Sequence, residues 1–225
     1  MHIGIILDGN RRYAKKLLLE PWKGHSFGAQ NVRNLLSWCI TLGVKELTLY
    51  CFSLENFKRS QKEVEVLMSI FLEEFKRMLS ANEVMEHKAR IRFIGRKSLF
   101  SQEIQDVLVA LEKKTEAFDQ YVVNFALGYS GRDELVQAVQ SIVQKAKSGE
   151  LDVIDEQTIT DHVQLRSEPD MVIRTSGELR LSGFLPWQST YSELYFTPKL
   201  WPEFTQEDLK AALEEYKQRQ RRYGK

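Results

Sequence analysis

The segment MHIGIILDGN, residues 1–10, introduces a pattern that recurs along the chain. Its unbroken apolar run, Ile3 to Leu7, has the length of a buried strand, and the turn-forming residues Asp8, Gly9 and Asn10 follow directly. Continuous rather than alternating apolar residues are typical of parallel strands that are covered on both faces. The segment therefore predicts the first strand of an α/β sheet, with polar groups placed where the strand ends.

Similar short apolar runs follow, and stretches with helical periodicity separate them. This alternation predicts a single α/β domain over residues 1–225, with a central, mostly parallel six-stranded sheet flanked by helices. We find no internal repeat and no low-complexity linker in the sequence. The expected strands are 3–7, 47–52, 91–94, 122–127, 171–173 and 194–196, and the expected helices are 25–42, 61–86, 101–117, 132–147, 155–164 and 206–222.

The composition excludes several classes of protein. The 32 Lys+Arg and 31 Asp+Glu residues leave a formal net charge of +1, so the chain has no overall positive field for a nucleic-acid partner. Its two cysteines, Cys39 and Cys51, lie in apolar stretches without metal-binding spacing, which favours core thiols in a reducing compartment. No apolar window reaches the length of a membrane span, so we expect a soluble, cytoplasmic protein.

Arginines accompanied by Gly, Ser or Asn follow four of the expected strands. Ligands of open α/β sheets bind beyond the carboxyl ends of the strands, where such loops meet. Guanidinium groups, hydroxyls and closely approaching backbone are suited to phosphate oxygens, so the loops together predict an anion site. They span Asp8 to Arg12, Ser53 to Arg59, Gly128 to Asp133, and Arg174 to Ser182.

Each feature also has a plain structural explanation when it is taken alone. The Asp8-Gly9-Asn10 sequence is typical of a turn, and isolated arginines are often surface ion-pair partners of little energetic value. His25 fits a packing histidine, and Glu193 fits a strand-edge carboxylate. The helix expected over 61–86 has apolar residues beyond one face, which by pattern alone favours a helix between the sheet and a neighbour. Only convergence of the loops in space would distinguish an anion site from these separate structural roles.

Asp8 is the single carboxylate in the first loop, between apolar residues and two arginines. A carboxylate beside a diphosphate is repelled unless a hard divalent cation lies between them, and Mg²⁺ accepts one or two carboxylates together with phosphate oxygens and water. Asp8 is therefore a candidate Mg²⁺ ligand. The phosphate-loop pattern GxxxxGK[ST] and a GxGxxG after the first strand are both missing, which disfavours nucleoside triphosphates and dinucleotides.

The motifs resemble those of the cis-prenyltransferases, the family of undecaprenyl and dehydrodolichyl diphosphate synthases. The resemblance runs from residue 2 to residue 224, and it implies an apolar tunnel in the fold. It implies that an allylic prenyl diphosphate, farnesyl or geranylgeranyl, loses diphosphate with Mg²⁺ as cofactor while isopentenyl diphosphate attacks. The product would be a long-chain (Z)-polyprenyl diphosphate, a precursor of lipid glycan carriers. The matching segments are Asp8 to Ala14, Gly24-His25, Tyr50 to Arg59, Gly128 to Arg132, Ile173 to Ser182, Trp187-Gln188 and Tyr191 to Phe196.

The resemblance also implies residue roles. Asp8, Ser53 and Asn56 would be catalytic, with Asp8 and Glu193 associated with the metal. An apolar channel would be needed for the growing chain, and the protein would be a homodimer that contacts the membrane peripherally when product leaves. The allylic diphosphate would be bound by Gly9, Asn10, Arg11, Arg12 and His25, and isopentenyl diphosphate by Arg174, Arg180 and Ser182, with Arg59 between the two substrates. Arg222 and Gly224 would reach the partner subunit's isopentenyl site. The tunnel would be lined by Val66, Leu67, Ile70, Phe71, Val123 and Phe125.

Three positions depart from the family pattern, namely Pro21, Leu179 and Pro186. They leave the affinity for the allylic substrate, the product length and the acceptor open. Two alternative functions therefore remain: prenyl transfer to an acceptor other than isopentenyl diphosphate, such as an alcohol oxygen, and service as a non-catalytic partner subunit. An all-α trans-prenyltransferase is excluded, because DDxxD pairs are missing and the strand pattern contradicts that fold.

Overall fold

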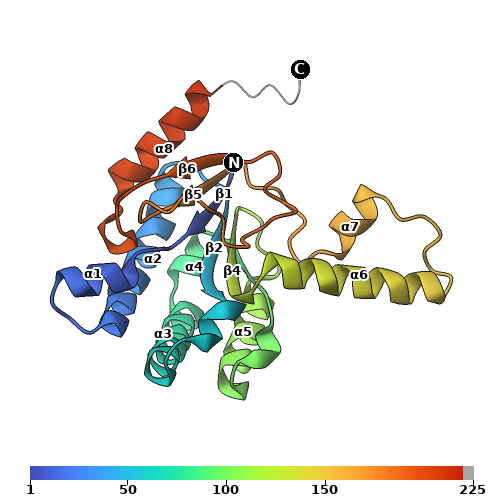
Figure 1. Ribbon diagram of the computed structural model, residues 1–225, viewed down its shortest axis with the longest axis horizontal. Helices are drawn as coiled ribbons and strands as arrows, with labels where there is room; N and C mark the ends of the chain where they lie inside the picture. Colours follow the sequence, from blue (N-terminus) through green and yellow to red (C-terminus); the bar gives the residue numbers. More distant parts are fainter. Residues whose placement is uncertain (220–225) are drawn as a thin grey trace.

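Six parallel strands form one sheet in the computed structural model, which describes residues 1–219. The strands are β1 (His2–Ile6), β2 (Glu46–Ser53), β3 (Ala89–Ile94), β4 (Tyr121–Tyr129), β5 (Met171–Arg174) and β6 (Glu193–Phe196). Their order across the sheet is β3-β4-β2-β1-β5-β6, and every neighbouring pair is parallel (Figure 1). The expected α/β fold with a six-stranded sheet is confirmed.

The helices connect the strands and cover the sheet, while α6 and α7 extend to one side of it (Figure 1). The α-helices are α1 (Asn10–Lys16), α2 (Gly24–Thr41), α3 (Gln61–Ser80), α4 (Glu83–Glu86), α5 (Gln102–Thr115), α6 (Gly131–Lys147), α7 (Glu156–His162) and α8 (Gln206–Gln218). Four short 3-10 helices join them: η1 (Pro21–Lys23), η2 (Leu54–Lys58), η3 (Lys97–Leu99) and η4 (Trp201–Glu203).

Two elements differ from the sequence prediction. The helix expected over 61–86 ends at Ser80, because Ala81 is extended with ψ 140°, and the short α4 follows separately. The hydroxyl of Ser80 donates to the carbonyl of Arg77 at 3.0 Å, within the last helical turn. The segment after β1, expected as a loop, instead begins α1 at Asn10. Gly9 makes this sharp entry possible with φ 114°, and a side chain there would press on Leu200 at 2.9 Å.

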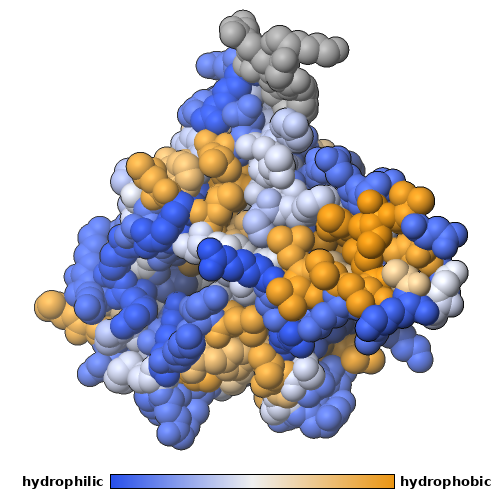
Figure 2. Space-filling view, turned by 45° about the vertical axis from the view of Figure 1, so that its right-hand side comes forward, coloured by the Kyte–Doolittle hydropathy of each residue, from blue (hydrophilic) through white to orange (hydrophobic). Residues whose placement is uncertain are grey.

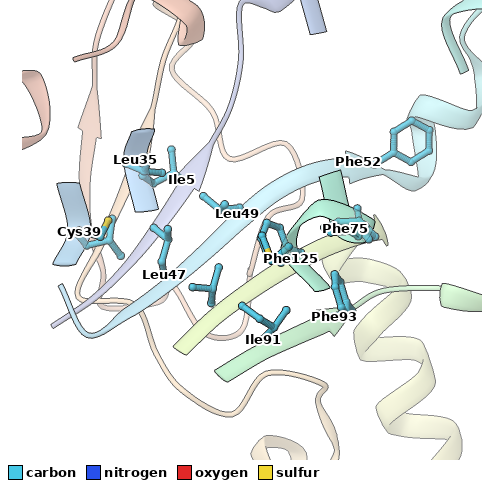
Figure 3. Close-up of a cluster of buried hydrophobic side chains, with 14 of the residues drawn as sticks. Ile5, Leu35, Cys39, Leu47, Leu49, Phe52, Phe75, Ile91, Phe93 and Phe125 are labelled. Atoms are coloured by element: carbon cyan, nitrogen blue, oxygen red, sulfur yellow. The ribbon is translucent and has the colours of Figure 1, made fainter. Parts of the chain in front are cut away.

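The larger core lies between the sheet and helices α2, α3 and α5. Figure 3 shows Leu35 and Cys39 of α2 facing the aliphatic residues of the sheet, with Phe75 of α3 among the aromatic ones. The Phe75 ring meets Phe93 and Phe125 edge to face, with centroids 4.9 and 5.3 Å away. Burial of each such ring stabilises the fold by about 1.5–3 kcal/mol. This aromatic contact fixes α3 against the sheet.

A second core on the opposite face is built on the segment that follows β5. Phe184 is fully buried and stacks on Tyr50 of β2 with centroids 4.8 Å apart. Gly131 lies so close to Pro186 that an added Cβ would meet the proline Cδ at 2.0 Å. Pro186, one of the three departures from the family pattern, therefore packs on the start of α6. These contacts anchor the end of the Arg174 to Ser182 loop.

The cysteines behave as the sequence predicts. Both are free, and burial raises the pKa of Cys39 and of Cys51 to about 12. Each thiol therefore stays protonated at neutral pH and serves as a small apolar core group. Within residues 1–219, none of the helices combines the length and the apolar character that crossing a membrane requires.

Candidate active site

The candidate site lies where β1, β2 and β5 end side by side. The chain leaves β1 toward β2 on one side and later returns to β5 on the other, so the connections diverge at this point of the sheet. Ile6 at the end of β1 is in register with Tyr50 of β2 and with Arg174 of β5. Open α/β sheets place their ligand sites at such switch points. The residues that follow these strands share one edge.

An ion pair between Asp8 and Arg174 joins two of the predicted loops. Arg174 Nη2 donates to Asp8 Oδ2 at 2.8 Å, and Arg12 Nη2 lies 3.6 Å from Asp8 Oδ1. Arg174 is buried, whereas a third of the Asp8 side chain is exposed to solvent. The Asp8 carboxylate thus holds the buried Arg174 guanidinium in place while part of it stays accessible to solvent.

The arginines keep Asp8 ionised. Partial burial of the carboxylate favours its neutral form, but hydrogen bonds from Arg174 and Ser176 and the charges of Arg174 and Arg12 outweigh it. The net effect holds the pKa of Asp8 below its usual value. At neutral pH the carboxylate is therefore negatively charged and available as a hard oxygen ligand.

The loop after β5 wraps around the two arginines. Arg174 Nη1 donates to Ser182 Oγ at 2.8 Å and to the carbonyl of Arg180, while Arg12 Nη1 donates to the carbonyl of Ser176 at 2.9 Å. Ser176 and Ser182 both hold left-handed backbone, with φ 80° and φ 51°. Such conformations are costly for residues other than glycine and persist where surrounding contacts impose them. The loop is therefore shaped around the guanidinium groups.

A second cluster gathers around Glu63 near the start of α3. Glu63 Oε1 accepts hydrogen bonds from Arg59 Nη1 at 3.0 Å and lies 3.0 Å from His25 Nε2, and Arg11 Nε is 3.7 Å from Glu63 Oε2. Both His25 and Glu63 are buried. Burial lowers the pKa of His25 despite the hydrogen bond to Glu63. One buried carboxylate thus orients three of the predicted binding residues.

The two clusters border one cavity of about 380 Å³, which we call the cup. Its lining is predominantly basic, with Asp8 as the carboxylate among the lining residues. Such a concave basic surface is suited to a diphosphate, whose oxygens accept several charge-assisted hydrogen bonds. The cup is lined by Leu7, Asp8, Gly9, Asn10, Arg11, Arg12, Lys15, His25 and Arg59.

An apolar cavity of about 90 Å³, the upper cavity, lies beside the cup between α2 and α3. Leu7, Asn10 and His25 line both spaces, so the polar cup and the apolar cavity are neighbours. Further along the same two helices lies a lower cavity of about 430 Å³, mostly apolar in its lining. The resemblance implies one tunnel, whereas the upper and lower cavities are separate and have no lining residue in common.

Most of the predicted tunnel residues face these cavities. Leu67, Ile70, Phe71 and Phe125 line the upper cavity, and Val123 lines the lower one. Val66 is not among the residues that line either cavity, and its place in the channel wall stays a prediction.

The remaining predicted residues lie at or away from the cup. Asn56 Oδ1 accepts the backbone N–H of Ser53 at 3.1 Å, which fixes the turn that leads to Arg59. The Arg180 side chain is exposed and pairs with Glu178 at 2.5 Å. The loop after β4 does not line the cup, and its Asp133 pairs instead with Arg96 at 2.7 Å. Arg222 and Gly224 lie outside the described residues.

Glu193 is not brought to Asp8 within one chain. It begins β6 in register with Met171, whereas Asp8 lies beyond the end of β1, so the two carboxylates are at opposite ends of parallel strands. Glu193 Oε2 instead accepts from Arg219 Nη1 at 2.9 Å. Strand direction thus separates the two carboxylates within one chain, and the association of Glu193 with the metal stays a prediction.

Sequence reasoning missed Glu63 and Lys15. A signal for Glu63 was available: it lies four residues before Leu67 and eight before Phe71, on the buried stripe of α3, where an unpaired carboxylate is costly. Lys15 lines the cup from α1, a helix that the sequence analysis treated as a loop.

Two buried polar atoms at the site lack a partner among residues 1–219. They are Asn10 Oδ1 and Arg174 Nε. Buried groups of this kind are normally satisfied, and exceptions concentrate where a ligand binds. Both atoms belong to residues predicted to bind diphosphate.

The residues present fit a magnesium ion held mainly by substrate. Asp8 supplies one ionised, partly exposed carboxylate beside the basic cup. No group of three or more His, Cys, Asp or Glu side chains in the described part of the chain is arranged to hold a metal. Mg²⁺ is commonly bound by one or two carboxylates and completes its shell with phosphate oxygens and water. Asp8 is thus suited to a metal that arrives with a diphosphate.

Comparison with known proteins agrees with this geometry. A family model described as putative undecaprenyl diphosphate synthase matches residues 6–224. An isoprenyl transferase of Thermus thermophilus is 46% identical, over 100% of this chain and 88% of that protein. A tritrans,polycis-undecaprenyl-diphosphate synthase (geranylgeranyl-diphosphate specific) of Pyrococcus abyssi is 42% identical, over 100% of this chain and 86% of that protein.

A solved structure extends the comparison to three dimensions. Lavandulyl diphosphate synthase from Lavandula x intermedia, in complex with dimethylallyl diphosphate, superposes with a TM-score of 0.92. It is 35% identical, and the match covers 100% of this chain and 98% of that one. Because the family model and these relatives match nearly the whole chain, the protein belongs to the undecaprenyl diphosphate synthase family and is a cis-prenyltransferase.

Proposed function

We propose that the protein condenses isopentenyl diphosphate with an allylic prenyl diphosphate, farnesyl or geranylgeranyl diphosphate, in a Mg²⁺-dependent reaction. Repeated condensation would give a long-chain (Z)-polyprenyl diphosphate, a precursor of a lipid glycan carrier. The observation that carries the proposal is that the basic cup and the apolar upper cavity are neighbours, with Leu7, Asn10 and His25 in the lining of both. A ligand that fits both spaces has an anionic head and a hydrocarbon tail.

The cup supports the role of binding the allylic diphosphate. Arg11, Arg12 and Arg59 contribute guanidinium groups, and His25 contributes a buried imidazole. When the bond between the allylic carbon and the diphosphate oxygen breaks, negative charge accumulates on the departing diphosphate. Donors already fixed in place stabilise that charge without reorganisation. Glu63 supports this function because it orients Arg59 and His25 before substrate arrives.

Asp8 would hold the magnesium ion, and Glu193 is not assigned to it in the same chain. When bound, Mg²⁺ supplies positive charge to the oxygens of the leaving diphosphate. Asp8 is also the counterion of Arg174, so the carboxylate links the metal position to the second substrate position.

Arg174, Arg180 and Ser182 are proposed to bind isopentenyl diphosphate, with Ser53, Asn56 and Arg59 between the two substrates. The Arg174 guanidinium is fixed by Asp8 on one side and by Ser182 on the other. Its Nε, which has no hydrogen-bond partner among residues 1–219, is a further donor for a phosphate oxygen. Two diphosphates held by neighbouring groups would bring the reacting carbons together and convert a bimolecular step into an effectively unimolecular one.

The apolar cavities support elongation of a hydrocarbon chain. Leu67, Ile70, Phe71 and Phe125 surround the upper cavity and keep water away from an allylic group that carries positive charge. Val123 lines the lower cavity, which offers further room for a longer product. The product length depends on how far the chain passes from the upper into the lower cavity.

We further propose a homodimer, with Arg222 and Gly224 reaching the partner subunit's isopentenyl site. Figure 2 shows a broad apolar area on the side of the molecule that carries α6. Val136, Val139 and Val143 are exposed on α6 at helical spacing, and Val153 and Ile154 are exposed after it. Exposed apolar patches of this kind mark interaction surfaces. Sedimentation velocity would show a dimer, and Val139→Glu would shift it to monomer.

The protein is also proposed to work in the cytoplasm and to contact the membrane peripherally when product leaves. A polyprenyl product is too apolar to accumulate free in water. Release of the product therefore requires an acceptor phase close to the enzyme.

Radiolabelled isopentenyl diphosphate, Mg²⁺ and farnesyl or geranylgeranyl diphosphate test the function directly. We expect butanol-extractable polyprenyl diphosphate from the purified protein alone, and a loss of activity by orders of magnitude in Asp8→Ala. Absence of extractable product with every allylic primer would contradict the proposal. It would favour the alternative of a non-catalytic partner subunit, which the intact Asp8, Arg12 and Arg174 cluster argues against.

A second candidate function is prenyl transfer to an acceptor other than isopentenyl diphosphate, such as an alcohol oxygen. The observation behind it is the similarity to a lavandulyl diphosphate synthase, a relative whose name is not that of a polyprenyl diphosphate synthase. Mass spectrometry of products from competing acceptors would distinguish the two. Incorporation of isotope-labelled isopentenyl diphosphate into the product supports elongation, whereas an unlabelled product that contains the competing acceptor supports the second candidate.

A further inference from the structure

The connection between α1 and α2 exposes leucines to solvent. Leu18 is 94% exposed and Leu17 is 45% exposed, although both belong to a run of three leucines, Leu17 to Leu19. Leu18 also holds left-handed backbone with φ 57°, a conformation that leucine rarely adopts. In Figure 1 this connection forms the left-hand edge of the molecule, on the opposite side from α6 and α7. The leucines therefore stand at an outer edge and have not folded into the core.

Cations surround this apolar tip. Lys15, Lys16 and Lys23 are exposed, and Glu20 is the single carboxylate between residues 15 and 23. Lys16 is paired with Glu203 at 2.5 Å, whereas Lys15 and Lys23 give the tip a positive rim. Apolar side chains flanked by lysines are typical of segments that lie in the interface of an anionic bilayer. The chain as a whole is nearly neutral, so this positive charge is local.

Both ends of the connection reach the cup. Lys15 precedes the leucines and His25 follows them, and each lines the cup. His25 also lines the upper cavity, where a prenyl tail would lie. The exposed leucines are thus only a few residues from the space in which an amphipathic substrate enters and an amphipathic product forms.

We propose that residues 15–23 form a docking surface for an anionic lipid bilayer, with Leu17 and Leu18 inserted between the lipid headgroups and the acyl chains. Lys15 and Lys23 face the anionic headgroups. The docked edge brings the cup beside the bilayer, so prenyl chains exchange between protein and membrane without crossing water. The use of this docking surface for prenyl exchange rests on the proposed function, but its binding to the bilayer does not require catalysis.

Flotation of the full-length protein with lipid vesicles tests the surface without any substrate. We expect binding to vesicles of phosphatidylcholine and phosphatidylglycerol, weaker binding to phosphatidylcholine alone, and loss of binding as salt is raised. The Leu17→Gln/Leu18→Gln variant should bind the anionic vesicles about tenfold less tightly, because the inserted apolar surface is removed.

A matched variant controls for general surface hydrophobicity. Leu99→Gln/Val109→Gln removes two apolar side chains that are 52% and 60% exposed elsewhere on the protein. The cations near Leu99 are already paired, Arg96 with Asp133 and Lys97 with Glu112. This control should bind the anionic vesicles as the unmodified protein does.

Three outcomes would contradict the proposal that residues 15–23 dock on an anionic bilayer. They are no binding to anionic vesicles, equal binding to both kinds of vesicle, and an equal loss of vesicle binding in the two double variants. Isopentenyl incorporation measured on a water-soluble short-chain primer separates this failure from failure of the proposed function. Leu17→Gln/Leu18→Gln should retain that activity while its vesicle binding falls. An inactive but vesicle-binding protein would contradict the proposed function and leave the surface supported.

Discussion

Replacement of Glu63 by Gln should destabilise the protein and weaken the cup at the same time. The substitution keeps the size of the side chain and one carbonyl acceptor but removes the charge. Glu63 is buried and serves Arg59, His25 and Arg11, so its loss leaves a half-buried cluster with an excess of positive charge.

The magnitude follows from the exposure of the partners. Removal of one member of a fully buried ion pair costs about 3–5 kcal/mol. Arg59 is 28% exposed and Arg11 is 54% exposed, so water compensates part of the lost interaction. Allowing for this, we expect the free energy of unfolding to fall by about 2 kcal/mol. For a chain of this size that corresponds to a fall in Tm of about 4–8 °C.

The assay is chemical denaturation combined with steady-state kinetics. Glu65→Gln is the matched control, because Glu65 is exposed on the same helix and only accepts a hydrogen bond from Gln61. Its free energy of unfolding should change by less than about 0.5 kcal/mol. In Glu63→Gln we also expect kcat/KM for the allylic diphosphate to fall by about tenfold, since Arg59 and His25 lose their orientation. Equal denaturation midpoints for Glu63→Gln and Glu65→Gln would refute the reasoning.

Three further predictions concern other parts of the site. Arg174→Lys keeps the charge but cannot contact Asp8, Ser182 and the Arg180 carbonyl together, so kcat/KM for isopentenyl diphosphate should fall by about a hundredfold; a change below threefold in steady-state assays would count against this role. Burial lowers the pKa of His25, so the unfolded chain takes up a proton first and the free energy of unfolding should decline as the pH falls below about 6.5. Urea titrations of His25→Gln should show a smaller decline, and an unchanged pH dependence would contradict the assignment. Ile70→Trp fills part of the 90 Å³ upper cavity and should shorten the products in mass spectra, whereas Val66→Trp, which lines neither cavity, should not; the same shift in both variants would exclude the upper cavity as the chain's path.

Much of the architecture could be predicted from the sequence, because the residue patterns of strands and helices are local. The apolar runs that became β1, β2 and β5 gave the positions at which polar loops had to begin. The direction of parallel strands then required those loops to share one edge. Local periodicity does not report where a helix stops, and for that reason the break after Ser80 and the helix that begins at Asn10 were missed.

The sequence by itself determined the α/β class and the residue types that crowd the strand ends, since these follow from short-range periodicity and chemistry. Only the tertiary structure decided which of those residues meet. Asp8 and Arg174 are 166 residues apart and become partners because β1 and β5 are neighbours in the sheet. Glu193 lies at the far end of β6, and Glu63 meets His25 across two packed helices. Pairings of this kind depend on strand order and helix packing, which are properties of the whole chain and not of any local segment.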